Sequence, residues 1–102
     1  QHGYAVACGI ICELYLSHRF CGFPKEKMYK TIYFIKDNYH GFYFDCNHYE
    51  RLYEYMKHDK KNESDTVNFT FLSDVGKIEI NQTASKEDIF DAIDFLRESV
   101  GL

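Results

Sequence analysis

The sequence lacks tryptophan, has one proline among 102 residues, and carries fewer basic residues than acidic ones, 12 against 16. The net charge of −4 argues against a nucleic-acid partner, because binding to phosphates needs a basic stripe that releases counterions. Long apolar runs are missing too: the longest uncharged one spans residues 4–12 and is followed by Glu13. A membrane-spanning helix needs about 20 apolar residues, so no membrane segment is predicted.

Motifs that hold nucleotides or activate nucleophiles are also missing. The glycines form no G-x-G-x-x-G or P-loop, and no Ser or Cys stands in a G-x-S-x-G setting. No secretory signal is recognisable, so we expect a cytoplasmic protein. Four cysteines allow three disulfide pairings. We favour free thiols, because Cys8 and Cys12 lie in an apolar helical run where a thiol acts as a small hydrophobe.

Two helices are predicted in the first part of the chain. The first spans about 3–19 and is apolar on nearly every face, so we expect it to be buried all round, by neighbouring elements or by another domain. The second is opened by Pro24, whose missing N–H costs nothing in a first turn, and ends at Gly41. Its apolar face is formed by residues at helical spacing: Met28, Ile32, Ile35 and Tyr39.

A third helix is predicted to begin at Asp45 or Asn47. The pattern Asn47-x-x-Glu50 fits the spacing of a capping box, in which the N-cap and the third helical residue bond to each other's backbone. The helix gives way to a charged loop over residues 57–65. Its predicted buried stripe comprises Tyr49, Leu52, Tyr53 and Met56.

The last part of the chain predicts a β-hairpin followed by a fourth helix. Apolar and polar residues alternate on both sides of a turn over residues 73–76. Ser85 is expected to cap the final helix with Asp88 as its weak capping-box partner, and Gly101 to end it. Residues 1–102 are therefore predicted to form a single mainly α domain, with four main helices plus one small β-hairpin. The core face of the last helix comprises Ile89, Ala92, Ile93 and Leu96.

Two places in the chain offer chemistry, each with a plainer alternative. His2 heads the apolar helix, where a fixed position would suit a metal ligand; the alternative is a frayed terminal histidine. Lys60 and Lys61 lie in the charged loop, where two ammonium groups could hold a phosphate or carboxylate; the alternative is a solvated run of charge. The chain opens Gln1-His2 without Met, so we expect a piece of a longer protein.

Three segments resemble motifs of the 3-dehydroquinate synthase family, in the same order. Residues 2–9 resemble H-G-E-A-V-A-x-G, with Tyr4 where the family usually has Glu. Residues 56–62 resemble M-x-x-D-K-K-N, and residues 68–76 are similar to the family's following hairpin. The likeness covers nearly the whole chain and corresponds to roughly the last third of the family's chain, its helical C-terminal domain.

The resemblance implies a function for the parent protein. The family converts DAHP, a seven-carbon keto-sugar-acid phosphate, to 3-dehydroquinate and phosphate in the shikimate pathway, using NAD and a divalent metal, usually zinc and sometimes cobalt. By position, His2 matches a metal-ligating histidine at the substrate site, and Lys60 or Lys61 matches a lysine that holds an anionic group of the substrate. In the family, the Glu at the position of Tyr4 could orient a metal ligand.

The resemblance also implies what this chain lacks. The other metal ligands, a Glu and a His, and the NAD-binding domain lie upstream in the family, so the fragment alone is expected to be inactive and to hold no metal or NAD tightly. The full-length enzyme is expected to be a homodimer. Two alternatives stay open: a related sugar-phosphate cyclase that makes an inosose- or valiolone-type ring, and a non-catalytic helical interaction module.

Overall fold

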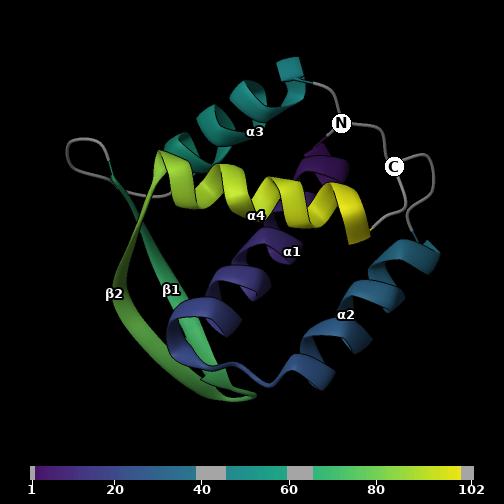
Figure 1. Ribbon diagram of the computed structural model, residues 1–102, viewed down its shortest axis with the longest axis vertical. Coiled ribbons are helices and arrows are strands. Elements are labelled where there is room, and N and C mark those ends of the chain that lie inside the picture. The colour runs from purple at the N-terminus through teal and green to yellow at the C-terminus, as the bar shows by residue number, and fades with distance from the viewer. Residues whose placement is uncertain (1, 39–45, 60–65, 100–102) are drawn as a thin grey trace.

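The computed structural model describes residues 2–38, 46–59 and 66–99. In these ranges the chain forms four helices and one antiparallel β-hairpin (Figure 1), which confirms the predicted mainly α fold. No helix among the described residues is long and apolar enough to cross a membrane. In chain order the elements are α1 (His2–Cys21), α2 (Lys25–Asn38), α3 (Cys46–Asp59), β1 (Thr66–Asp74), β2 (Lys77–Ser85) and α4 (Lys86–Ser99).

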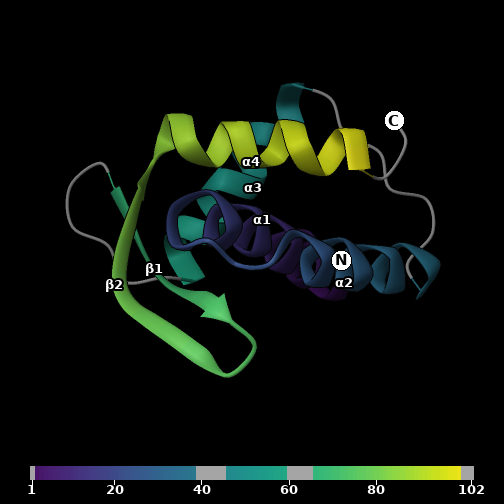
Figure 2. The same ribbon diagram turned by 60° about the horizontal axis from the view of Figure 1, so that its bottom comes forward.

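Helix α1 is the element around which the others assemble. It contacts α2, α3, α4 and strand β1. Figure 2 shows α4 across one side of α1 and α2, with the turn of the hairpin on the opposite side. The predicted apolar face of α4 is buried against this centre, as are Met28, Ile32 and Ile35 of the predicted face of α2. Tyr39, the last residue of that face, lies outside the described residues. The fully buried side chains include Ile11, Leu16, Met28, Ile32, Phe69, Phe71, Ile89, Ile93 and Leu96.

A short turn reverses the chain between α1 and α2. Gly22 has a φ of +73°, a left-handed conformation that glycine adopts without a Cβ clash, and this ends α1 close to the predicted boundary. The N–H of Gly22 donates to the carbonyl of His18, and the N–H of Phe23 donates to that of Ser17. Nδ1 of His18 lies 2.8 Å from the carbonyl oxygen of Phe23. These bonds satisfy carbonyls that the helix end would otherwise leave unpaired.

Polar and aromatic contacts fix α4 against α1. Arg19 donates to Asp91 at 3.1 Å and also lies 3.7 Å from Asp88, both on α4. Tyr15 stacks on Phe95 with ring centroids 4.7 Å apart. Because Tyr15 and Arg19 are one turn apart on α1, these contacts mark the side of α1 that faces α4.

The hairpin covers the opposite side of α1, near the C-terminal end of that helix. Oγ of Ser17 is buried and accepts a hydrogen bond of 3.1 Å from the N–H of Leu72 on β1. The β1–β2 pairing shifts register at two points, between Phe69 and Phe71 and between Leu72 and Asp74. Asp74 is in turn held by Nζ of Lys27 on α2 at 2.6 Å. Both helices of the α1–α2 pair therefore anchor the hairpin.

The described elements do not cover α1 on every face, so burial of the remaining surface by another domain stays a prediction. Val6 is 38% and Ile10 41% exposed, although both lie in the apolar run. Residue 17 lies on the same strip of the helix as residue 10, two turns further on. The hairpin reaches this strip only at Ser17, so the strip towards the N-terminus of α1 has no cover among the described residues.

The predicted capping box at Asn47 and the predicted end of the third helix differ from the structure. α3 begins at Cys46, so Asn47 lies inside the helix and is not its N-cap, while Asp45 lies outside the described residues. Glu50 forms an ion pair with Lys86 at 3.0 Å. The helix continues to Asp59, so the first three residues of the predicted loop are helical.

The capping box at the start of α4 is confirmed. The N–H of Ser85 donates to Oδ2 of Asp88, and the N–H of Asp88 donates to Oγ of Ser85, each at 3.1 Å. The free-thiol prediction is confirmed for Cys8, Cys12 and Cys21. Burial raises the pKa of the Cys8 thiol to about 12, and burial also raises the pKa of Cys12. Both thiols therefore stay protonated at neutral pH and are poor nucleophiles.

Replacing Ser85 by Ala is expected to lower the free energy of unfolding of the chain by about 1 kcal/mol, because one of the two reciprocal cap bonds is lost. Urea unfolding followed by circular dichroism measures this. The matched control is Glu87→Ala, an exposed position in the same first turn, where the change should stay within about 0.5 kcal/mol. Equal losses in the two variants would show that the box does not stabilise α4.

Stability is also expected to fall in alkali because of the buried thiols. The pKa of Cys8 is 9.0 when unfolded and about 12 when folded, so its contribution is fully present below pH 9 and is lost as the pH rises towards 12. Above pH 9, each such thiol should lower the free energy of unfolding by about 1.4 kcal/mol per pH unit. Urea unfolding between pH 8 and 10.5 should give a shallower decline for Cys8→Ala than for the wild type. Parallel declines would contradict the shifted pKa.

Candidate functional site

His2 is the first residue of α1 in the structure, and its side chain lies outside the described residues. It precedes Val6 by one turn, on the strip of α1 that the hairpin leaves open. The helix end that carries the candidate metal ligand is thus continuous with an uncovered surface. The prediction that His2 binds a metal stays a prediction.

The first turn of α1 contains no acidic residue. A helix N-terminus carries about half a positive charge, which disfavours a cation nearby unless negative groups compensate. A carboxylate at the position of Tyr4 would have supplied such a negative group. A divalent cation next to this helix end would therefore need negatively charged ligands from outside the first turn of α1.

The described residues do not fit a complete metal site. Among residues 2–38, 46–59 and 66–99, no group of three His, Cys, Asp or Glu side chains lies close enough to hold an ion. A catalytic zinc site usually has three protein ligands, and this part of the chain does not bring three together. Any metal chemistry of His2 would depend on ligands beyond the described residues.

Lys60 and Lys61 lie outside the described residues, but the structure describes the elements on both sides of them, α3 and β1. α3 ends at Asp59 and β1 begins at Thr66, so the position of α3 determines where the intervening segment starts. The packing of α3 on α4 is therefore the part of this candidate site that the structure describes.

Lys86, the first residue of α4, holds α3 in position. Its Nζ donates to Oε1 of Glu50 at 3.0 Å and lies 5.1 Å from the ring centroid of Tyr53 and 5.5 Å from that of Phe90. A cation near two aromatic rings and one carboxylate is attracted by all three groups. The ion pair with Glu50 raises the pKa of Lys86, so this lysine stays charged.

A second contact secures α3 about two turns further along α4. The Tyr49 hydroxyl donates to Oδ1 of Asp94 at 2.5 Å, and the Tyr49 ring meets Phe90 edge-on at 5.5 Å. Burial, followed by the bond to Asp94, raises the pKa of the Tyr49 hydroxyl and keeps it protonated as a donor. α3 is thus tied to α4 by two independent polar contacts.

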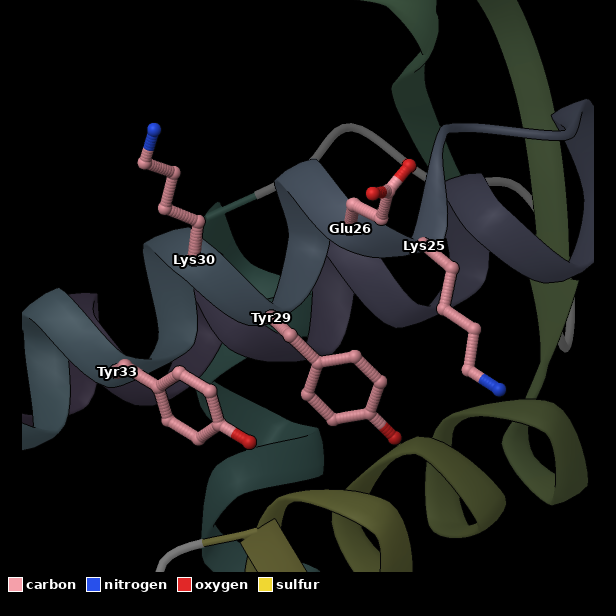
Figure 3. Close-up of a pocket in the computed structure, with 5 residues that line it drawn as sticks. All are labelled: Lys25, Glu26, Tyr29, Lys30 and Tyr33. Carbon is pink, nitrogen blue, oxygen red and sulfur yellow. The ribbon is translucent and has the colours of Figure 1, made fainter.

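An open surface hollow on α2 contains none of the predicted site residues. Figure 3 shows Lys25, Tyr29 and Tyr33 directed towards α4, while Lys30 points away from it. The hollow has a volume of about 510 Å³ and is lined by residues of α2. The ring centroid of Tyr29 lies 6.0 Å from that of Phe95 on α4. Neither Tyr29 nor Tyr33 was among the residues predicted from the sequence. The spacing of two tyrosines four residues apart was the available signal for an aromatic strip there.

Comparison with known proteins gives one consistent result. The family model described as 3-dehydroquinate synthase C-terminal matches residues 1–62. The chain is 54% identical over 101 residues to the 3-dehydroquinate synthase of Parabacteroides distasonis, which covers 99% of this chain. It is 36% identical over 103 residues to the 3-dehydroquinate synthase of Clostridium tetani, with 91% of this chain covered. No solved structure gives a significant match.

The chain covers less than a third of the length of these relatives. It spans 29% of the length of the Parabacteroides distasonis protein and 25% of that from Clostridium tetani. The most similar of these sequences aligns along almost the whole chain, and the family model covers α1, α2 and α3. Residues 1–102 therefore belong to the 3-dehydroquinate synthase family and correspond to its C-terminal domain.

Proposed function

We propose that this chain contributes the metal- and substrate-binding part of an enzyme that converts DAHP to 3-dehydroquinate and phosphate. The observation that carries the proposal is the 54% identity to a 3-dehydroquinate synthase over 99% of the chain. The relatives from three genera share this name, which favours this reaction over that of a related sugar-phosphate cyclase. The reaction itself, with NAD and a divalent metal, is part of the proposal.

In this proposal, His2 supplies one metal ligand from the first turn of α1. Helical backbone fixes the position of its Cα, and the rigid packing of α1 against α4 and β1 holds that helix in place. The bound metal would polarise a substrate hydroxyl as a Lewis acid. The uncovered strip that follows His2 leaves room for the remaining ligands to approach from outside this chain.

Lys60 and Lys61 would hold an anionic group of the substrate. An ammonium group that faces a phosphate or carboxylate in a partly dry site acts at a lower effective dielectric than at a free surface. The Lys86 and Tyr49 contacts fix α3, and this supports a defined starting point for the segment that carries the two lysines. The contribution of this chain is therefore one of positioning and charge, while NAD binding belongs to the rest of the protein.

In the full-length protein, His2→Ala is expected to lower metal content and kcat together, because one of three ligands is lost. Metal analysis and phosphate release from DAHP with NAD present measure the two effects. His58→Ala, which removes an exposed histidine on α3, is the matched control and should change neither. The 102-residue chain alone should release no phosphate and serves as the blank. Normal zinc content and rate in His2→Ala would show that His2 is not a ligand.

Replacement of Lys60 or Lys61 by Ala in the full-length protein should raise KM or lower kcat/KM at least about tenfold for one of the two lysines, near 1.4 kcal/mol. The other variant should be nearly neutral, and neither should change the melting temperature, since exposed charges contribute roughly 0 to 1 kcal/mol. Lys36→Ala, an exposed lysine on α2, is the control. Wild-type kinetics in both variants would mean that the two lysines are only solvated surface charges.

A further inference from the structure

The junction between β2 and α4 contacts the chain on both sides of the segment that carries the two candidate substrate-binding lysines. β2 ends at Ser85 and α4 begins at Lys86, so the junction consists of two neighbouring residues. The lysine segment, residues 60–65, lies between the end of α3 and the start of β1. Figure 1 shows that α3 ends and β1 begins on the side of the molecule where α4 begins.

Backbone pairing holds the start of β1 at this junction. Thr66, the first residue of β1, pairs with Ser85 across the hairpin, and the next residue, Val67, pairs with Ala84. The side chains of Val67 and Ala84 are both buried in the core. Ser85 also exchanges hydrogen bonds with Asp88 in the capping box of α4. The chain that follows the lysine segment is therefore fixed to the first turn of α4.

Side-chain contacts hold α3 at the same junction. Nζ of Lys86 lies 3.0 Å from Oε1 of Glu50 and 5.1 Å from the ring centroid of Tyr53, which is buried. Nζ of Lys57, one turn beyond Tyr53, lies 5.8 Å from the same ring. Tyr53 precedes the last residue of α3 by six residues, which is about 9 Å along the helix axis. Lys86 therefore fixes α3 close to the point where the lysine segment begins.

The exposure of these groups separates the Lys86 contact from the packing that keeps the domain folded. The side chain of Lys86 is 49% exposed and that of Glu50 is 54% exposed, so their ion pair contributes little to the free energy of unfolding. The core contribution of α3 comes from buried side chains, among them Leu52 and Met56. A lysine that adds little stability, yet joins the elements on both sides of one segment, is suited to control the position of that segment.

We propose that Lys86 is a positioning residue for the substrate-binding lysines. It holds the end of α3 at a fixed place relative to the start of β1, and this determines where the lysine segment leaves and re-enters the fold. The inference rests on the proposed function for the role of Lys60 and Lys61. Lys86 acts through the two ends of the segment and not by contact with the substrate.

The kinetic test uses Lys86→Met in the full-length protein, which keeps most of the side chain and removes its charge. We expect KM for DAHP to rise about fivefold with kcat unchanged, because a substrate contact made in both the ground state and the transition state is weakened. Lys86→Arg keeps the cation that pairs with Glu50 and should have nearly the wild-type KM. The matched control is Lys25→Met, an exposed lysine at the first position of α2, which should change neither constant.

A double-mutant cycle separates positioning from a general structural role. Of Lys60→Ala and Lys61→Ala, the variant with impaired kinetics provides the background. Adding Lys86→Met to it should cause no further rise in KM, because the group that Lys86 positions is already absent. A full additional rise in that background would overturn the proposal, since Lys86 would then act independently of the two lysines. A wild-type KM in the single variant Lys86→Met would overturn it as well.

Tryptic cleavage after Lys60 or Lys61 gives a readout that needs no activity. In the native full-length protein, the initial cleavage rate at these sites, read by peptide mass spectrometry, should be about fivefold higher in Lys86→Met than in the wild type. Lys25→Met should be cleaved there at the wild-type rate. An unchanged rate in Lys86→Met would overturn the proposal, whether or not the protein turns over DAHP.

The two readouts distinguish failure of this inference from failure of the proposed function. If the wild type releases no phosphate from DAHP, or if both lysine variants keep wild-type kinetics, the proposed role in substrate binding fails. The cleavage rate then decides alone whether Lys86 fixes the segment. If the wild type is active and one lysine variant is impaired, a normal KM in Lys86→Met removes the inference and leaves the function.

Discussion

The packing of α1 against α4 and the hairpin is the constraint on which the rest of the structure depends. Ile11, Cys12 and Leu16 are completely buried, and every other helix and strand β1 contacts this helix. The two sides of α1 are secured differently: Arg19 and Tyr15 hold α4, whereas Ser17 holds the hairpin through a backbone N–H. Because α1 also begins with His2, the same packing that forms the core determines where the candidate ligand enters the site.

Local signals predicted most of the fold. The reciprocal Ser85 and Asp88 bonds depend on residues three apart, so the sequence was sufficient to identify them. The apolar faces of α2 and α4 depend on helical spacing and were also correct. Of the two predicted caps of α3, Asn47 lies inside the helix, while Asp45 stays a prediction. Glu50 pairs with Lys86, a contact distant in sequence that spacing alone does not reveal.

Less of the candidate site than of the fold could be predicted from the sequence, because much of the site depends on groups outside the described residues. Residue type identified His2 only as a possible metal ligand and Lys60 only as a possible contact for an anionic group. Their proposed roles come from the resemblance to the family's motifs. The exposure of Val6 and Ile10 was missed because an apolar run indicates burial without saying which element provides it. The hairpin meets α1 at Ser17, near the C-terminal end of the helix, and a pattern of residue types does not show where two elements cross.

The bond from Leu72 to Ser17 has a consequence for how the hairpin can vary. The hairpin contributes a backbone N–H, which every residue except proline possesses, and α1 contributes a specific hydroxyl. For this one bond, the chemical requirement therefore falls on a helical position, while the strand side needs only the correct backbone path. Leu72 can be exchanged for any residue except proline without loss of this bond, whereas Phe69 and Phe71 on the same strand are constrained by their burial in the core.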